Sequence, residues 1–180
     1  LPQMARPLHD AGLDRVNMSA DSLRPDRIAA IARRDRGFDP IAAATAAQDA
    51  GLSPIKINFV VLRGTNDDEI EDFARLTIER PWHVRFVETM PLGVGEPARV
   101  SRDGLVPNAE TRARIEAALG PLVPLDADDP ADESRNFRAP GAHGVVGFIS
   151  PVTEPYCGTC NRMRLTADGR FHLCLLNDDE

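Results

Sequence analysis

Apolar residues follow two alternating spacings through the first half of the chain. Runs rich in β-branched and apolar residues, typical of strands, occupy 15–19, 55–61 and 83–88, and 15–19 reads as a short buried strand. Helical spacing, with proline near the first turn or acidic and cap residues at the start, occupies 25–34, 40–50 and 66–79. Residues 1–12 read as the end of a helix that Gly12 stops. The alternation predicts parallel strands joined by helical crossovers.

The pattern changes after Met90, where strands are no longer separated by regular helices. One more helix is predicted over 108–119, and strands are predicted over 144–150, 162–166 and 170–175. Asp168 and Gly169 lie between the last two strands and are a strong hairpin signal. The acidic stretch 126–133 reads as a loop.

These elements predict an α/β fold in two parts. Residues 1–100 are expected to form part of an incomplete TIM-like barrel of βα units, since three strands cannot close a barrel. Residues 101–180 are expected to form a C-terminal ligand-binding region with a β-hairpin.

Charge and composition narrow the possible partners. The 180 residues have a formal net charge of −7 and a pI of about 5.1, which argues against binding nucleic acid or an anionic membrane surface. No apolar run approaches the roughly 20 residues that cross a bilayer, and the start does not resemble a signal peptide. We therefore expect a cytoplasmic protein. Because the sequence starts with Leu1 and ends shortly after its last cysteine, we expect it to be a fragment.

The three cysteines, Cys157, Cys160 and Cys174, cannot all pair as disulfides within one chain, and their spacing suggests metal ligation. A 4Fe-4S cluster normally takes four cysteines, so three would leave one iron open to another ligand. The alternative is a zinc site with His172 as the fourth ligand, because residues 172 and 174 of a strand face the same side. Spacing alone leaves both alternatives open.

Five motifs occur in order along nearly the whole chain, and together they resemble one family. They are RVNMSADSL at 15–23, KIN at 56–58, LRGTNDD at 62–68, RFVETMPLG at 85–93 and CGTCNRMRLT at 157–166. This series resembles the GTP 3',8-cyclase family of the radical S-adenosylmethionine superfamily, which acts in molybdenum cofactor biosynthesis.

The resemblance implies an enzyme that forms a 5'-deoxyadenosyl radical and converts GTP to (8S)-3',8-cyclo-7,8-dihydroguanosine 5'-triphosphate. It implies a C-terminal 4Fe-4S cluster held by Cys157, Cys160 and Cys174, with its open iron binding the guanine. Implied S-adenosylmethionine contacts are Ser19 and Met90, and implied GTP contacts are Lys56, Arg162, Met163 and Arg164. A homodimer, and a downstream cyclic pyranopterin monophosphate synthase as pathway partner, are also implied.

Four candidate residues also have an ordinary interpretation. Lys56, the only lysine, could lie in solvent, although strand alternation places it with Asn58 on one face, which favours a ligand. Arg85 is a secondary candidate for phosphate, since it could equally reach solvent or pair with Glu88. Ser19 could belong to a turn, and Met90 could fill core space.

The sequence departs from the family in two respects. It contains neither the CxxxCxxC motif of the radical-generating cluster nor the family's C-terminal tail with paired glycines. We therefore expect the chain by itself to be inactive. Two other functions remain open, namely a different radical S-adenosylmethionine enzyme with an auxiliary cluster, and a non-catalytic zinc-binding module.

Overall fold

The computed structural model describes residues 1–33, 38–92, 96–127, 129–174 and 176, and its main element is a six-stranded sheet. The strands lie in the order β1-β2-β3-β6-β5-β4. Strands β1, β2, β3 and β6 are parallel to one another, and β5 pairs antiparallel with both β6 and β4. Their bounds are β1 Val16–Ser19, β2 Ile55–Val61, β3 His83–Glu88, β4 Val123–Pro124, β5 Arg135–Arg138 and β6 Val145–Ile149. The predicted α/β class with a mostly parallel sheet is confirmed.

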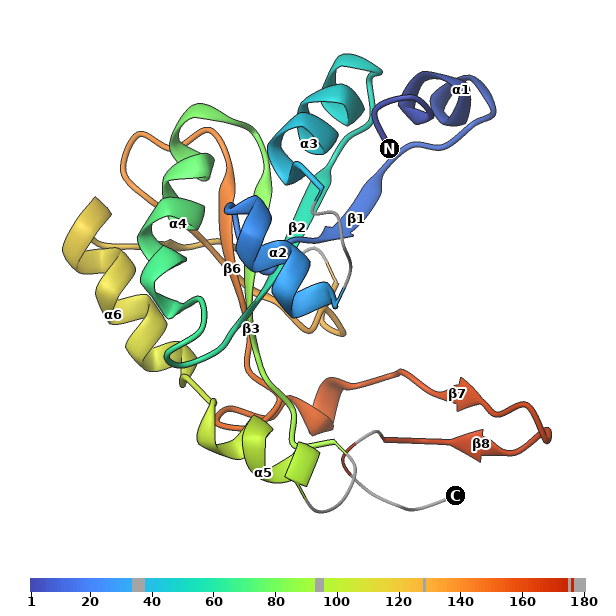
Figure 1. Ribbon diagram of the computed structural model, residues 1–180, viewed down its shortest axis with the longest axis vertical. Coiled ribbons are helices and arrows are strands. Elements are labelled where there is room, and N and C mark those ends of the chain that lie inside the picture. The colour runs from blue at the N-terminus through green and yellow to red at the C-terminus, as the bar shows by residue number, and fades with distance from the viewer. Residues whose placement is uncertain (34–37, 93–95, 128, 175, 177–180) are drawn as a thin grey trace.

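Helices cover one face of this sheet, and α5 Glu96–Asp103 lies beyond the ends of its strands (Figure 1). The helices are α1 Ala5–Asp10, α2 Pro25–Ala32, α3 Pro40–Asp49, α4 Ile70–Glu79, α5 Glu96–Asp103 and α6 Asn108–Leu119. Helices α3, α4 and α6 pack on the central strands, and α4 contributes Phe73, whose ring stacks on Phe59 of β2 with 4.0 Å between centroids. Phe86 of β3 meets Phe59 edge-on at 5.7 Å. The core is therefore an aromatic and aliphatic layer between helices and sheet.

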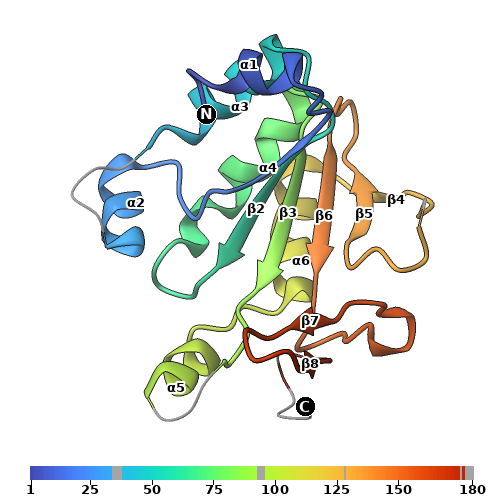
Figure 2. The same cartoon turned by 90° about the vertical axis from the view of Figure 1, so that its right-hand side faces the viewer.

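The opposite face of the central strands is not covered by these helices (Figure 2). Along β2, buried Ile57 and Phe59 alternate with partly exposed Lys56 and Asn58. The predicted placement of Lys56 and Asn58 on one face is confirmed, because side chains of a strand alternate between faces.

Strand β1 differs from its prediction as a buried strand. Its residues alternate between partly buried and exposed positions, because it pairs only with β2 and forms an edge of the sheet. An edge strand keeps solvent on its unpaired side.

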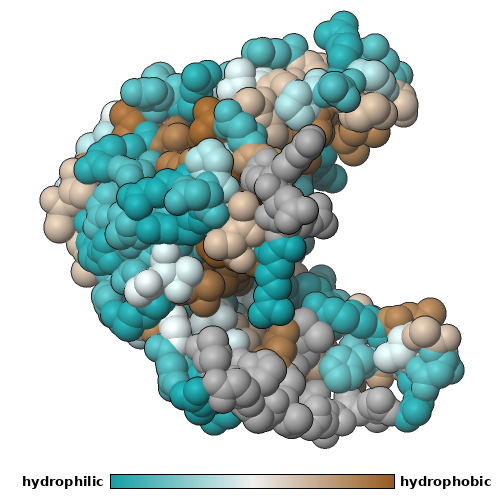
Figure 3. Space-filling model, viewed as in Figure 1, coloured by the Kyte–Doolittle hydropathy of each residue, from teal (hydrophilic) through white to brown (hydrophobic). Residues whose placement is uncertain are grey.

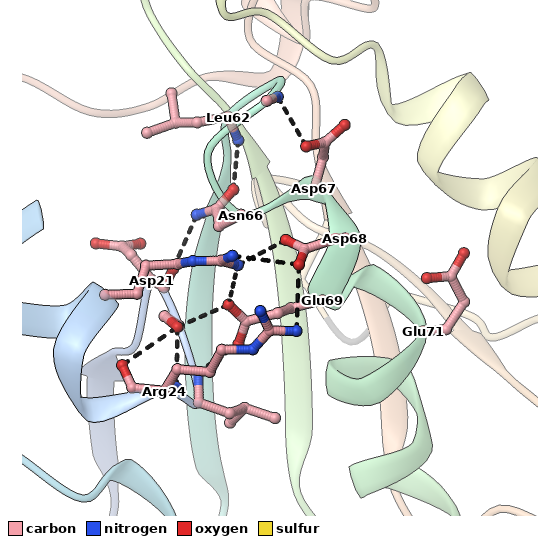
Figure 4. Close-up of polar contacts among 12 residues, drawn as sticks. Asp21, Arg24, Leu62, Asn66, Asp67, Asp68, Glu69 and Glu71 are labelled. Atoms are coloured by element: carbon pink, nitrogen blue, oxygen red, sulfur yellow. Dashed lines mark hydrogen bonds and ion pairs between the residues drawn. The ribbon is translucent and has the colours of Figure 1, made fainter.

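The connection between β2 and α4 also differs from its prediction. A short 3₁₀ helix, η1 Asp67–Glu69, precedes α4, and Asn66 does not cap it. The fully buried Asn66 side chain instead donates to the carbonyls of Asp21 and Val60 at 2.8 and 2.9 Å and accepts from the N–H of Leu62 at 2.7 Å (Figure 4). Asn66 thus ties the ends of β1 and β2 together.

The second half adds strands to the same sheet. Helix α6 matches its prediction, and β6, predicted over 144–150, pairs with β3. The sequence did not indicate α5, β4 or β5. The acidic stretch is confirmed as a loop at its described positions, 126–127 and 129–133.

After β6 the chain leaves the sheet. It forms the 3₁₀ turn η2 Cys157–Thr159 and then pairs β7 Arg164–Leu165 with β8 Phe171–His172, shorter strands than predicted. The pair projects from the body of the molecule, and the space-filling view shows a wide hollow between it and the end of the sheet near α1 and α3 (Figure 3). Among the described residues, no helix has the length and apolar content needed to cross a membrane.

Candidate functional site

The three cysteines line one pocket, at the end of the sheet where β3 and β6 finish. Its volume is about 120 Å³, and Arg162, Arg164 and Met90 also line it. Ligands of parallel α/β sheets usually bind at the carboxyl ends of the strands. The structure therefore brings together six residues that the sequence predicted as site residues: Cys157, Cys160, Cys174, Arg162, Arg164 and Met90.

Arg162 favours the thiolate form of Cys160. Its backbone N–H bonds to the sulfur, and its Nη2 donates to the same Sγ at 3.5 Å; together they lower the pKa of the Cys160 thiol. Arg162 also lies over the Tyr156 ring, 5.1 Å from its centroid, and hydrogen bonding to Tyr156 and then Cys160 raises its own pKa. Since the thiolate is the metal-binding form, the contacts suit a metal ligand.

The donor set can be compared with the two predicted metals. Among the described residues, no three His, Cys, Asp or Glu side chains are gathered closely enough to hold a metal ion, and His172 does not line the pocket. A tetrahedral zinc ion needs four ligands at about 2.0 to 2.3 Å from one centre. An iron–sulfur cluster binds each cysteine through a different iron and so spreads its thiolates apart. Three free thiols around one pocket fit a cluster better than a single ion.

Glu88 at the end of β3 holds the segment that leads to Cys157. Its side chain is 1% exposed and accepts from the N–H groups of Asn108, Val152 and Thr153 at 2.9, 3.1 and 2.9 Å, and from the Thr153 hydroxyl. One carboxylate thus joins β3, the start of α6 and the chain after β6. It fixes where the cysteine segment leaves the sheet.

A second group of predicted residues lies on the open face of the sheet. Strand register aligns Ser19, Asn58, Arg85, Gly147 and Asn136 in one row across five strands. The Arg85 side chain is 6% exposed, and its Nε donates to Asn58 Oδ1 at 2.7 Å. The two ordinary interpretations of Arg85 are therefore wrong. Its side chain is buried and does not reach solvent, and Glu88 bonds to other residues.

The absence of a side chain at Gly147 makes room for Arg85. A Cβ at Gly147 would lie 2.4 Å from Ser134 Oγ and 3.1 Å from Arg85 Cγ. A larger residue would push these groups apart. Gly147 thus leaves room for the Arg85 side chain beside β6.

Positive charge dominates around His83 on the same face. Burial lowers the pKa of His83, and Lys56, Arg85 and Arg138 lower it further, while Asp132 acts in the opposite direction. Lys56 pairs with His83 in the strand register. Because several cations repel an added proton, this region suits an anionic ligand.

Four predicted residues do not line the cysteine pocket. Ser19 is exposed at the carboxyl end of β1, and Lys56 lies on the open sheet face, while Met163 is 59% exposed. Arg85 is also outside the pocket, on the sheet face described above. The sequence-based site is thus two neighbouring groups, one around the cysteines and one on the sheet.

Sequence reasoning missed Glu88 and Tyr156. Glu88 was considered only as a partner for Arg85, although a carboxylate at the end of a buried strand is a signal for a polar anchor. Tyr156, the only tyrosine, directly precedes Cys157, and that position could have marked it.

Two known protein families match the sequence of this chain. Residues 82–180 match the family described as Molybdenum Cofactor Synthesis C, and residues 1–77 match the Radical SAM superfamily. The chain belongs to the Molybdenum Cofactor Synthesis C family. The family resemblance inferred from the five motifs is confirmed.

The relatives with similar sequences that are named here are all described as GTP 3',8-cyclases. The chain is 45% identical over 180 residues to a GTP 3',8-cyclase of Petrotoga mobilis, covering 100% of this chain and 54% of the relative. It is 46% identical over 182 residues to the GTP 3',8-cyclase of Moorella thermoacetica, covering 100% and 54%, and 45% identical over 175 residues to that of Alkaliphilus metalliredigens, covering 96% and 52%. The chain thus spans about half the length of these curated relatives.

Proposed function

We propose that this chain works in a GTP 3',8-cyclase of molybdenum cofactor biosynthesis, where it holds the C-terminal 4Fe-4S cluster and contacts GTP. The observation that carries the proposal is the pocket in which Cys157, Cys160 and Cys174 lie together with Arg162 and Arg164. Thiolates and guanidinium groups in one place suit an iron–sulfur cluster beside an anionic nucleotide. The named relatives support the same activity.

The chain's own residues have distinct roles in this proposal. Cys157, Cys160 and Cys174 bind the cluster, and Arg162, Met163 and Arg164 contact GTP beside it. Lys56 and Arg85 on the sheet face attract the phosphates, because a guanidinium presents several N–H donors to phosphate oxygens. Ser19 and Met90, at the ends of β1 and β3, contact S-adenosylmethionine.

The bound cluster would supply an iron with an open coordination position for the guanine. Glu88 would hold the segment that leads to Cys157, and Asn66 the ends of β1 and β2. Residues 1–100 form the barrel-like part of this enzyme, an incomplete TIM-like barrel, and 101–180 form its cluster-binding part with the hairpin. The product passes to a cyclic pyranopterin monophosphate synthase, and the intact enzyme is a homodimer.

Metal analysis after anaerobic reconstitution with iron and sulfide tests the cluster. We expect about four irons and four sulfides per chain with broad visible absorption, both lost in Cys174→Ser. His172→Ala is the matched control and should retain the iron. Stoichiometric zinc that survives reconstitution and disappears in His172→Ala would contradict the cluster and support the zinc module.

Nucleotide binding tests the substrate. GTP should perturb the absorption or paramagnetic resonance of the reconstituted chain, and Arg162→Gln with Arg164→Gln should weaken this effect. Equal perturbation by uridine triphosphate would argue for another radical S-adenosylmethionine enzyme. Because the sequence has no CxxxCxxC motif, we expect no cyclised product from this chain alone, with S-adenosylmethionine and reductant present.

A further inference from the structure

Glu133 lies between two predicted GTP-binding arginines that come from different parts of the fold. Its Oε1 is 3.6 Å from Nη1 of Arg85 on β3, and its Oε2 is 3.7 Å from Nη1 of Arg162 in the cysteine segment. Glu133 itself belongs to the acidic loop before β5. One carboxylate therefore links the sheet face to the cysteine pocket.

The two arginines are not equally fixed. Arg85 is held by Asn58 and its side chain is 6% exposed, whereas the Arg162 side chain is 43% exposed. Burial is the main cause of the lowered pKa of His83, and Lys56, Arg85 and Arg138 lower this pKa further, against the opposite effect of Asp132. The Glu133 carboxylate thus lies within 4 Å of two guanidinium groups, one held by the sheet and one partly exposed.

Glu133 is held loosely at this position. Both of its ion-pair distances exceed the usual 2.7 to 3.2 Å of an N–H···O hydrogen bond. Its side chain is 28% exposed, so water screens the attraction. A phosphate carries more charge and more acceptor oxygens than a carboxylate, and it can make the direct bonds that Glu133 does not make.

The neighbouring surface leaves space for Glu133 to move. A pocket of about 520 Å³ lies between the acidic loop and the cysteine turn, and Glu133 lines it together with Tyr156, Gly158 and Thr159. The loop has no regular secondary structure at its described positions. A displaced carboxylate can therefore turn away from the arginines without disturbing the sheet.

We propose that Glu133 is an internal counter-ion that occupies the anion position between Arg85 and Arg162, is displaced by the substrate's phosphates, and so sets the affinity for nucleotide. This inference rests on the proposed function, because it takes GTP as the ligand. Glu133 does not touch the reacting atoms and acts through the two arginines. It lowers affinity for every anion and favours ligands with enough charge to replace it.

Binding of GTP and of inorganic tripolyphosphate to the anaerobically reconstituted chain, measured by calorimetry, tests the inference. We expect Glu133→Gln to bind both ligands about threefold to tenfold more tightly than the unaltered chain. Glu110→Gln is the matched control, since it makes the same change of charge at an exposed ion pair with Arg63 and should leave both affinities unchanged. Structural damage at the site would weaken binding, so tighter binding separates the counter-ion from a structural role.

The other binding results separate failure of the counter-ion inference from failure of the proposed function. If the unaltered chain binds GTP and Glu133→Gln binds it equally or more weakly, the counter-ion is overturned and the proposed function stands. If no variant binds GTP, the proposed function fails, and tripolyphosphate decides the inference. Tighter tripolyphosphate binding by Glu133→Gln would then retain the counter-ion for another anionic ligand, and unchanged binding would overturn it.

Discussion

Glu88 shows how one buried side chain can position a distant ligand segment. It lies at the end of β3, two residues before Met90, and its carboxylate accepts hydrogen bonds from Asn108, Val152 and Thr153. Hydrogen bonds to a charged group are stronger than those between neutral groups. The loop that leads to Cys157 thus depends on a residue of the central sheet.

Replacing Glu88 with alanine should lower the free energy of unfolding by about 2 to 3 kcal/mol, because buried N–H donors lose their acceptor. Urea unfolding followed by circular dichroism measures the change. Glu79→Ala, at an exposed position near the end of α4, should change stability by less than about 0.5 kcal/mol. Equal stability of the two variants would contradict the role of Glu88.

His83 predicts a pH dependence of stability. Its pKa in the folded chain lies below the ordinary value of 6.5, so the unfolded chain binds more protons as the pH falls through that value. Stability from neutral His83 is therefore present above about pH 6.5 and is lost below it. Stability measured at several pH values should fall less steeply below about pH 6.5 in His83→Gln than in the unaltered chain, and an equal fall in both would contradict the role of His83.

At the level of elements, β6 is the strand that joins the two halves of the chain. It pairs with β3 of the first half and β5 of the second, so the sheet is continuous from β1 to β4. The chain enters β6 through Gly144, where a Cβ would lie 2.2 Å from the carbonyl oxygen of Trp82 and 2.6 Å from that of Arg80. Only glycine allows this close approach of backbones.

Substitution of Gly144 with alanine should therefore destabilise the fold by about 3 kcal/mol, since backbone atoms cannot move aside as a flexible side chain can. Thermal unfolding measures the effect. Gly158→Ala is the control, because its Cβ would meet nothing within 4 Å, and it should melt close to the unaltered chain. A Gly144→Ala melting temperature equal to that of the control would show that the connection can adjust.

At the level of the whole molecule, the sheet and the cysteine segment differ in how they are held. The sheet has a continuous core of aromatic and aliphatic side chains. The segment after β6 instead exposes large apolar residues: Met163 at 59%, Leu165 at 67%, Phe171 at 56% and Leu173 at 58%. Its strands pair over two residues each. Ligation by three cysteines would add the cross-links that its packing does not provide.

Hydrogen exchange should detect this difference. Before reconstitution, amides of 156–174 should exchange much faster than those of β2 and β3, because few buried contacts protect them. Reconstitution with iron and sulfide should slow exchange in 156–174 and leave β2 and β3 unchanged. Cys174→Ser treated in the same way should show no slowing of exchange. Slowing in that variant would mean that ligation by the three cysteines is not what protects these amides.

The sequence by itself determined the long elements of the sheet and the helices that cover it. Periodicity is a local property, so β2, β3 and α6 could be predicted within the chain, as could the face shared by Lys56 and Asn58. The cysteine spacing alone left a zinc site and an iron–sulfur cluster open, whereas the five motifs in order indicated the family. The missed elements, α5, β4 and β5, are short, and pairing with a neighbour, more than their own pattern, stabilises the two strands.

Only the tertiary structure decided which of these residues meet. Glu133 and Arg85 are far apart in sequence, and no local pattern indicates that the acidic loop reaches both Arg85 and Arg162. Nor does spacing indicate that Glu88 holds the loop before the cysteines instead of pairing with Arg85 three residues away. These contacts depend on the register of β3, β6 and β5, which the packing of the whole sheet sets. The cysteine motif was thus legible in the sequence, whereas the charges around its pocket were brought together by the fold.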